Sequence, residues 1–291
     1  MPVPDVHEQW SFAFFMAFVM LAIAAVYLRG WIRFRSARSS PVPAWRRAAF
    51  LTGLLTLWTA GCSPLSVLDH RSLTAHMLKH LILMTVAAPL ILAATPALRL
   101  LNELPNRSSW SILLLGRSLL STLTGFIADP VFCWVAATCA VIGWHLPGVF
   151  GLGQRSHWIH SVEDASFFLA GLLFWWPIMK ARRGAQSAPD LSAPLYLFLA
   201  TLPCDILSAF LVFSNRVVYS GYAATTLMFG WSPLEDQECA GALMWVWVTF
   251  AYLIPAAVIT VQALSAHQAP DLPGCTGLAR GRCHSPGAEV L

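Results

Sequence analysis

Long apolar runs alternate with short polar stretches along most of this chain. An apolar run of about 20 residues is long enough to cross a bilayer as an α-helix. Runs of this length lie at Trp10–Leu28, Ala48–Leu68, Leu73–Ala94, Phe126–His145, Trp158–Met179, Pro194–Phe213 and Cys239–Val261. The pattern predicts an all-α fold, a polytopic transmembrane helix bundle of about seven spans within residues 1–267.

The composition agrees with a protein embedded in a lipid bilayer. Of the 291 residues, 57% are hydrophobic and only 11% are charged, and the mean hydropathy is +0.63. A soluble domain carries about 25% charged residues. Every polar stretch between two runs is too short to bury a core of its own, so any chemistry must lie within the bundle or at its faces.

Basic residues are concentrated on one side of the predicted bundle. Most of the 18 lysines and arginines follow the first, third, fifth and seventh runs: Arg29, Arg33, Arg35, Arg38, Arg46, Arg47, Arg99, Arg107, Arg117, Lys180, Arg182, Arg183, Arg280 and Arg282. Because basic loops stay in the cytoplasm, the N-terminus is predicted to lie outside and the C-terminus inside. Basic residues confined to such short loops are explained by topology, so we expect no nucleic-acid partner.

Two segments differ from the pattern of spans. Ser108–Leu123 is apolar but contains Arg117, and it lies in a loop that must return to the cytoplasmic side. We interpret it as an interfacial amphipathic helix or an inner-leaflet segment. Residues 268–291 are rich in Gly, Pro and Ala with little periodicity, which is typical of a disordered cytoplasmic tail.

A pair of histidines begins the third apolar run. His76 and His80 are four residues apart, so on a helix they share one face. Polar groups at membrane depth are costly, and they commonly mark a functional site. In the predicted topology only His267 and His284 fall on the cytoplasmic side, so the other histidines gather at the outer face. His76 and His80 can therefore supply two ligands of a metal site, and other residues can supply the remaining ligands.

Further candidate ligands lie on two other predicted spans. His157, His160 and Asp164 share one helix face, and Glu163 could orient an imidazole by accepting its second N–H. His145 belongs to the motif GWHLPG, where the proline and glycine would end the helix and leave the ring at the membrane surface. The predicted metal ligands are His76, His80, His145, His157, His160 and Asp164.

Residue types narrow the choice of metal without settling it. Imidazoles suit copper, zinc and iron, whereas thioethers favour cuprous copper. Histidines on two helices can also ligate a haem. Asp205 lies in the middle of the sixth run, where a lone carboxylate needs a partner, and it is a candidate relay for ions or protons.

Four motifs together resemble one protein family. DHRSLTAHMLKHLILMTVAAPLILAATP, GWHLPG, HWIHSVEDASFFLAGLLFWWPI and QECAGALMW follow in this order. They are similar to the CtaG-type cytochrome c oxidase assembly factors, which are polytopic proteins of the bacterial inner membrane. The similarity spans about residues 45–260, and it excludes the first run and the tail. This family is distinct from the single-span copper-carrying factor that has the same name.

The resemblance implies a non-enzymatic role in maturing a haem-copper oxidase, with oxidase subunits or other assembly factors as partners. Copper handling by the histidine cluster at the outer face is our leading hypothesis. A copper or proton transporter that uses Asp205 and a haem-binding membrane cytochrome are the alternatives. No catalytic motif such as HExxH, a P-loop or a nucleophile elbow occurs in the sequence, so we predict no enzymatic activity.

Overall fold

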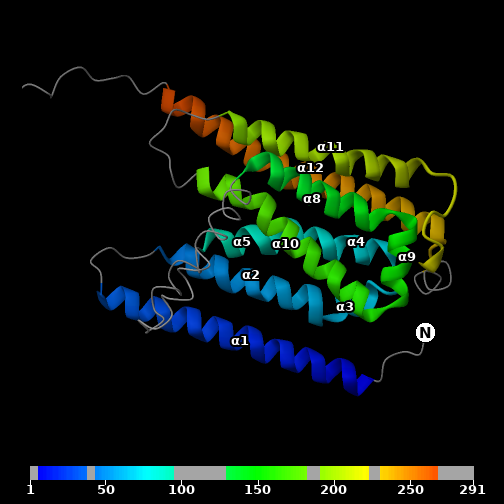
Figure 1. Cartoon of the computed structure of the whole chain (residues 1–291), viewed down its shortest axis with the longest axis horizontal. Coiled ribbons are helices and arrows are strands. Elements are labelled where there is room, and N and C mark those ends of the chain that lie inside the picture. Colours follow the sequence, from blue (N-terminus) through cyan, green and yellow to red (C-terminus); the bar gives the residue numbers. More distant parts are fainter. Residues whose placement is uncertain (1–5, 38–42, 95–128, 182–190, 223–229, 268–291) are drawn as a thin grey trace, which may run out of the picture.

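The computed structural model describes residues 6–37, 43–94, 129–181, 191–222 and 230–267, and within these ranges every regular element is a helix (Figure 1). The elements are α1 (Val6–Ala37), α2 (Ala44–Cys62), α3 (Pro64–Leu68), α4 (Leu73–Ile82), the π-helix η1 (Leu83–Ala87), α5 (Ala88–Ala93), α8 (Pro130–His145), α9 (Pro147–Arg155), α10 (His157–Ala181), α11 (Ser192–Phe213), the 3₁₀-helix η3 (Ser220–Tyr222) and α12 (Pro233–His267). The predicted all-α fold is confirmed for this part of the chain.

Several of these helices are long and apolar enough to cross a membrane. Five segments qualify: Ala44–Leu68, Leu73–Ala93, Trp158–Lys180, Ser192–Phe213 and Pro233–Ser265. The pair α8 and α9, bent by 72°, adds a sixth if it is one broken span. The first predicted span lies in α1, whose described apolar part, Met16–Arg29, is too short to count. The count of seven and the orientation of the termini therefore stay predictions, and Ser108–Leu123 and residues 268–291 lie outside the described ranges.

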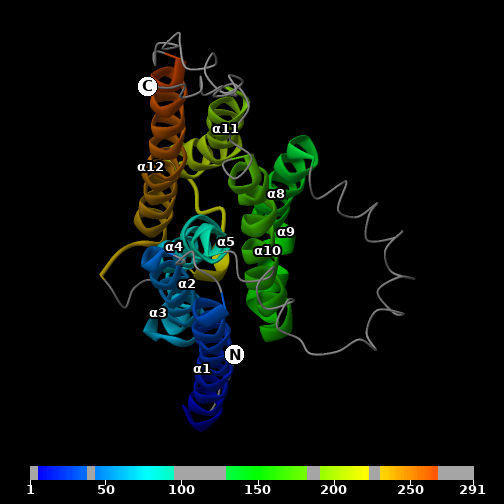
Figure 2. The same ribbon diagram turned by 90° about the vertical axis from the view of Figure 1, so that its left-hand side faces the viewer.

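The line formed by α4, η1 and α5 runs through the middle of the bundle (Figures 1 and 2). Helix α2 packs against this line, as do α10 and α12, while α11 packs along α12 and α8 packs against α10. The main core includes Met77, Phe174 and Val248, all nearly inaccessible to solvent. Large apolar side chains such as Phe18 and Ile206 are 71% exposed, as expected for surfaces in contact with lipid.

A carboxylate from α12 fixes the beginning of α4. Asp236 is 1% exposed, and it accepts hydrogen bonds from the hydroxyl of Ser72 at 2.8 Å and the backbone N–H of Leu73 at 2.6 Å. The hydroxyl of Thr74 donates to it at 2.7 Å, and the N–H of Thr74 donates at 3.2 Å. The first N–H groups of a helix have no partner within the helix, so an acceptor there is stabilising. Asp236 thereby sets the depth and the rotation of the helix that carries the histidine pair.

The middle span changes its helical pitch just after the histidine pair. Pro89 has no N–H to donate to the carbonyl of Thr85, and the π-helix η1 ends two residues before it. The indole N–H of Trp175 donates to the carbonyl of Met84 at 3.1 Å. A Cβ on Gly171 would lie 2.7 Å from that same carbonyl, so the glycine permits the close approach of α10. The π-helix η1 therefore packs closely against α10.

The fourth predicted span ends as expected at its proline. Asp129 caps its beginning by accepting from the backbone N–H of Val131 at 2.8 Å, with Pro130 at the first position. At the other end, α8 stops at His145 and α9 begins at Pro147. The ring of His145 is buried against Met77 of α4 and Phe167 of α10, and it does not lie at the surface as predicted.

Candidate metal site

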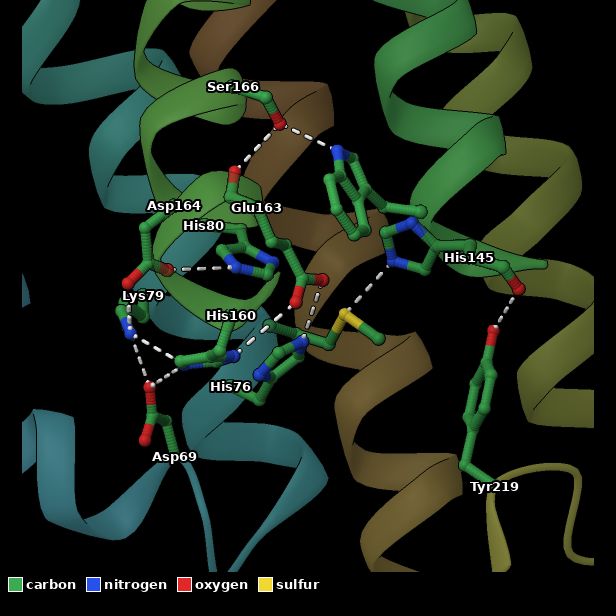
Figure 3. Close-up of polar contacts among 12 residues, drawn as sticks. Asp69, His76, Lys79, His80, His145, His160, Glu163, Asp164, Ser166 and Tyr219 are labelled. Carbon is green, nitrogen blue, oxygen red and sulfur yellow. Dashed lines mark hydrogen bonds and ion pairs between the residues drawn. The ribbon is translucent and has the colours of Figure 1, made fainter. Parts of the chain in front are cut away.

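Polar side chains from two helices and a loop meet at the end of the bundle where α4 and α10 begin (Figure 3). Helix α4 contributes His76, Lys79 and His80, and α10 contributes His160, Glu163 and Asp164; Asp69 comes from the loop before α4. The spacing in each helix places these side chains on one face, and the two faces oppose each other. The result is a compact cluster of imidazoles, carboxylates and one ammonium in a largely apolar bundle.

Lys79 is the hub of an ion-pair network. Its Nζ lies 2.5 Å from Asp69 Oδ2 and 2.6 Å from Asp164 Oδ2. His160 Nε2 is 3.0 Å from the same ammonium and 3.1 Å from Asp69 Oδ2. The side chain of Lys79 is only 3% exposed, so its charge depends on these partners. The network joins the loop to both helices.

Asp69 is held in its charged form. Burial acts to raise its pKa, but the hydrogen bond from His160 and the charge of Lys79 outweigh burial, so the pKa lies well below its usual value. The backbone carbonyl of Asp69 accepts from the hydroxyl of Tyr222 at 2.7 Å. This contact anchors the loop to the segment that follows α11.

His76 and His80 lie beside this network with less complete hydrogen bonding. Their ring centroids are 4.3 Å apart, and both side chains are almost fully buried. His76 Nε2 is 3.5 Å from Glu163 Oε1, and His80 Nε2 is 3.3 Å from Asp164 Oδ1. These are electrostatic contacts of poor hydrogen-bond geometry, and among the described residues no ring nitrogen of either histidine has a hydrogen-bond partner. Such buried orphan nitrogens need an explanation.

Two groups of side chains have the spacing that a metal ion requires. His76, His80 and Glu163 offer ligand atoms that all lie within 4.8 Å of one another, and all three residues are buried. Asp69, His70 and His160 form the second group. In the second group the ammonium of Lys79 already binds the carboxylate and contacts the imidazole. The first group is therefore the better candidate, because its imidazole nitrogens are available.

The structure brings together four of the six predicted ligands: His76, His80, His160 and Asp164. His145 lies on the far side of His80, where its Nδ1 is 2.6 Å from the carbonyl of Val141 and its Nε2 is 3.1 Å from Met77 Sδ. His157 begins α10, and its side chain lies outside the described part of the structure.

The predicted relay Asp205 is half-buried on α11, apart from the cluster, and its Oδ1 has no hydrogen-bond partner among the described residues. Lys79, Asp69 and Asp236 were not predicted as parts of the site. A signal for Lys79 was present in the sequence, since a charge inside an apolar run demands a partner. No pattern in the sequence could connect Asp236 with a helix that begins more than 160 residues earlier.

Comparison with known proteins gives one match. Residues 25–266 match the sequence family described as cytochrome c oxidase caa3 assembly factor. The matched region includes every residue of the cluster described above. No curated protein and no solved structure matches the chain.

Proposed function

The chain belongs to the cytochrome c oxidase caa3 assembly factor family, and we propose that it serves assembly by binding copper through His76, His80 and Glu163. In this proposal the protein is a carrier and has no enzymatic activity. It lies in a bacterial inner membrane with the site toward the outer face, and it passes the ion to an oxidase subunit or to another assembly factor. Copper is its cargo.

One observation carries the proposal: the two buried imidazoles have nitrogens without hydrogen-bond partners beside a buried carboxylate. An unsatisfied buried polar atom costs about 1–3 kcal/mol, and several of them occur here at one point. An ion bound by His76, His80 and Glu163 would give one nitrogen of each ring a partner at the same time. Imidazole and carboxylate ligands are compatible with copper, and a haem-copper oxidase requires copper for its own centre.

The charges of the cluster also favour a cation. Asp69, Glu163 and Asp164 are three carboxylates, whereas Lys79 is the only Lys or Arg side chain within salt-bridge distance of them among the described residues. His160 faces carboxylates with both ring nitrogens and could carry a second positive charge. An excess of negative charge remains in a low-dielectric environment, where an additional cation is stabilising.

A single ion suits this geometry better than a haem. His76 and His80 are on adjacent turns of one helix with ring centroids 4.3 Å apart, so they cannot bind opposite faces of one porphyrin. Transport through Asp205 has less support, because this residue is not part of the cluster. The absorption spectrum described below tests the haem alternative, and Asp205→Asn tests the transporter.

The test combines a gene deletion with a pair of histidine variants. Deletion is expected to lower the copper content and the activity of the oxidase, and added copper should partly restore them. His76→Ala/His80→Ala should reproduce the deletion and should lose the copper that the purified wild type binds through these two residues. His70→Ala, whose side chain is 48% exposed and belongs to the other group, is the matched control and should behave as the wild type.

Three results would contradict the proposal. Normal copper content and activity of the oxidase in the deletion strain would exclude a role in copper supply. A Soret band that is present in the purified wild type and lost in the double variant would show that these histidines bind haem and not copper. Copper that is lost from His70→Ala and retained in His76→Ala/His80→Ala would move the site to the second group.

A further inference from the structure

A second set of side chains with potential metal-donor atoms lines a cavity in the core, next to the cluster of His76, His80 and Glu163. The cavity measures about 20 Å³, enough for one water-sized sphere, and its potential donors are Met77, His80, Met84, His145, Cys204 and Met244. These donors come from α4, η1, α8, α11 and α12. None of the thioethers or the thiol belongs to the site proposed above, whereas His80 borders both places.

The sequence directs these donors inward. Met77, His80 and Met84 are separated by three and four residues, so they lie on one face of the middle span. Methionine in a core is usually a filler of irregular space. Here, however, His145 Nε2 lies 3.1 Å from Met77 Sδ, so an imidazole nitrogen and a thioether sulfur of the lining already face each other. His80 adds ring nitrogens that have no hydrogen-bond partner among the described residues.

The chemistry of the lining selects a soft monovalent ion. Among the described residues that line the cavity there is no carboxylate, no lysine and no arginine. The hydroxyl of Thr85 is already used, since it donates to the carbonyl of Leu81 at 2.7 Å and accepts from Trp247 at 2.9 Å. Thioether, thiol and imidazole donors favour cuprous copper over zinc, magnesium or calcium. A divalent ion would also bring a larger charge into a place without compensating carboxylates.

We propose that this cavity binds one cuprous ion, with the thioethers of Met77 and Met244 and the imidazole of His145 as its principal ligands. Met84 and Cys204 lie in the same lining and can complete the coordination. This inference rests on the proposed copper function, because it gives the same cargo a second position deeper in the bundle. The imidazole of His80 is shared between the two positions, so the ion need not leave the protein to pass between them.

The experiment measures cuprous binding to the full-length protein in detergent under anaerobic, reducing conditions. A chromophoric cuprous chelator competes for the metal and reports the affinity, and X-ray absorption reports whether sulfur is bound to copper. The variant is Met77→Leu/Met244→Leu, which removes two thioethers at nearly constant volume. Met20→Leu is the matched control, because Met20 packs in the separate cluster of α1, α2 and α5.

We expect sulfur ligands in the wild type and in Met20→Leu. In Met77→Leu/Met244→Leu the sulfur signal should fall and the cuprous affinity should drop at least tenfold. Unchanged affinity and sulfur signal in that variant would overturn the inference. Cuprous copper bound in the wild type by nitrogen and oxygen alone would also overturn it, and this second result does not depend on the stability of any variant.

The failure of this inference can be told apart from failure of the proposed function. Copper bound through nitrogen and oxygen at His76, His80 and Glu163 should persist in Met77→Leu/Met244→Leu, whereas Glu163→Gln should weaken it and retain the sulfur signal. The methionine variant could bind cuprous copper normally while the copper content of the oxidase still depends on the protein. In that case only the proposed second position is wrong. If the copper content of the oxidase does not depend on the protein, the proposed function is wrong, whatever the sulfur signal shows.

Discussion

Replacing Lys79 by methionine tests whether the ion-pair network holds the site together. Methionine keeps the apolar stem and removes the ammonium, which leaves Asp69 and Asp164 without the contacts at 2.5 Å and 2.6 Å. Asp69 is 0% exposed, so its charge would lose its nearest cation in the interior. Breaking a buried pair in this way costs about 3–5 kcal/mol. At about 2–4 °C for each kcal/mol, the melting temperature should fall on the order of 10 °C.

The assay is thermal unfolding of the detergent-solubilised protein, followed by the fluorescence of its 13 tryptophans. Lys180→Met, at the exposed end of α10, is the control and should melt as the wild type does. Lys79→Met/Asp69→Asn should be more stable than the sum of the two single effects, because it removes both charges of the pair. A loss below about 1 kcal/mol in Lys79→Met, or strict additivity in the double variant, would refute the reasoning.

Three further predictions concern the elements that position the site. Asp236→Ala should destabilise the protein by about 1–3 kcal/mol through loss of the cap on α4, whereas Glu238→Ala, on the exposed side of α12, should leave the melting temperature unchanged. Gly171→Ala should cost about 1–3 kcal/mol because its Cβ would approach a carbonyl of η1 at 2.7 Å; Gly143→Ala, with nothing within 4 Å, should be neutral or stabilising in the same melting assay. Asp205→Asn should leave copper binding unchanged in metal analysis of the purified protein, and loss of metal uptake into vesicles would instead support the transporter.

The helices and the histidine pair could be predicted because both depend on local spacing. Apolar runs of bilayer length and an i,i+4 pair such as His76 and His80 can be found without any knowledge of packing. The partners of Lys79 could not be identified, because they come from a loop and from a distant helix. The cap from Asp236 has the same origin, since only the packing of α12 on α4 brings it there. His145 was expected at the surface, because a proline signals the end of a helix and does not reveal the direction of the next one.

The ligands of the proposed site are tied to the network that surrounds them. Glu163 faces His76 with one carboxylate oxygen and His160 with the other. Asp164 likewise faces His80 with one oxygen and Lys79 with the other. Neither imidazole can therefore shift without disturbing a carboxylate that the network also holds. A site arranged in this way is ordered before the ion arrives, which favours tight binding. Release then requires a change in the network itself, and Asp164, 24% exposed, is the member of it that a docking partner can reach.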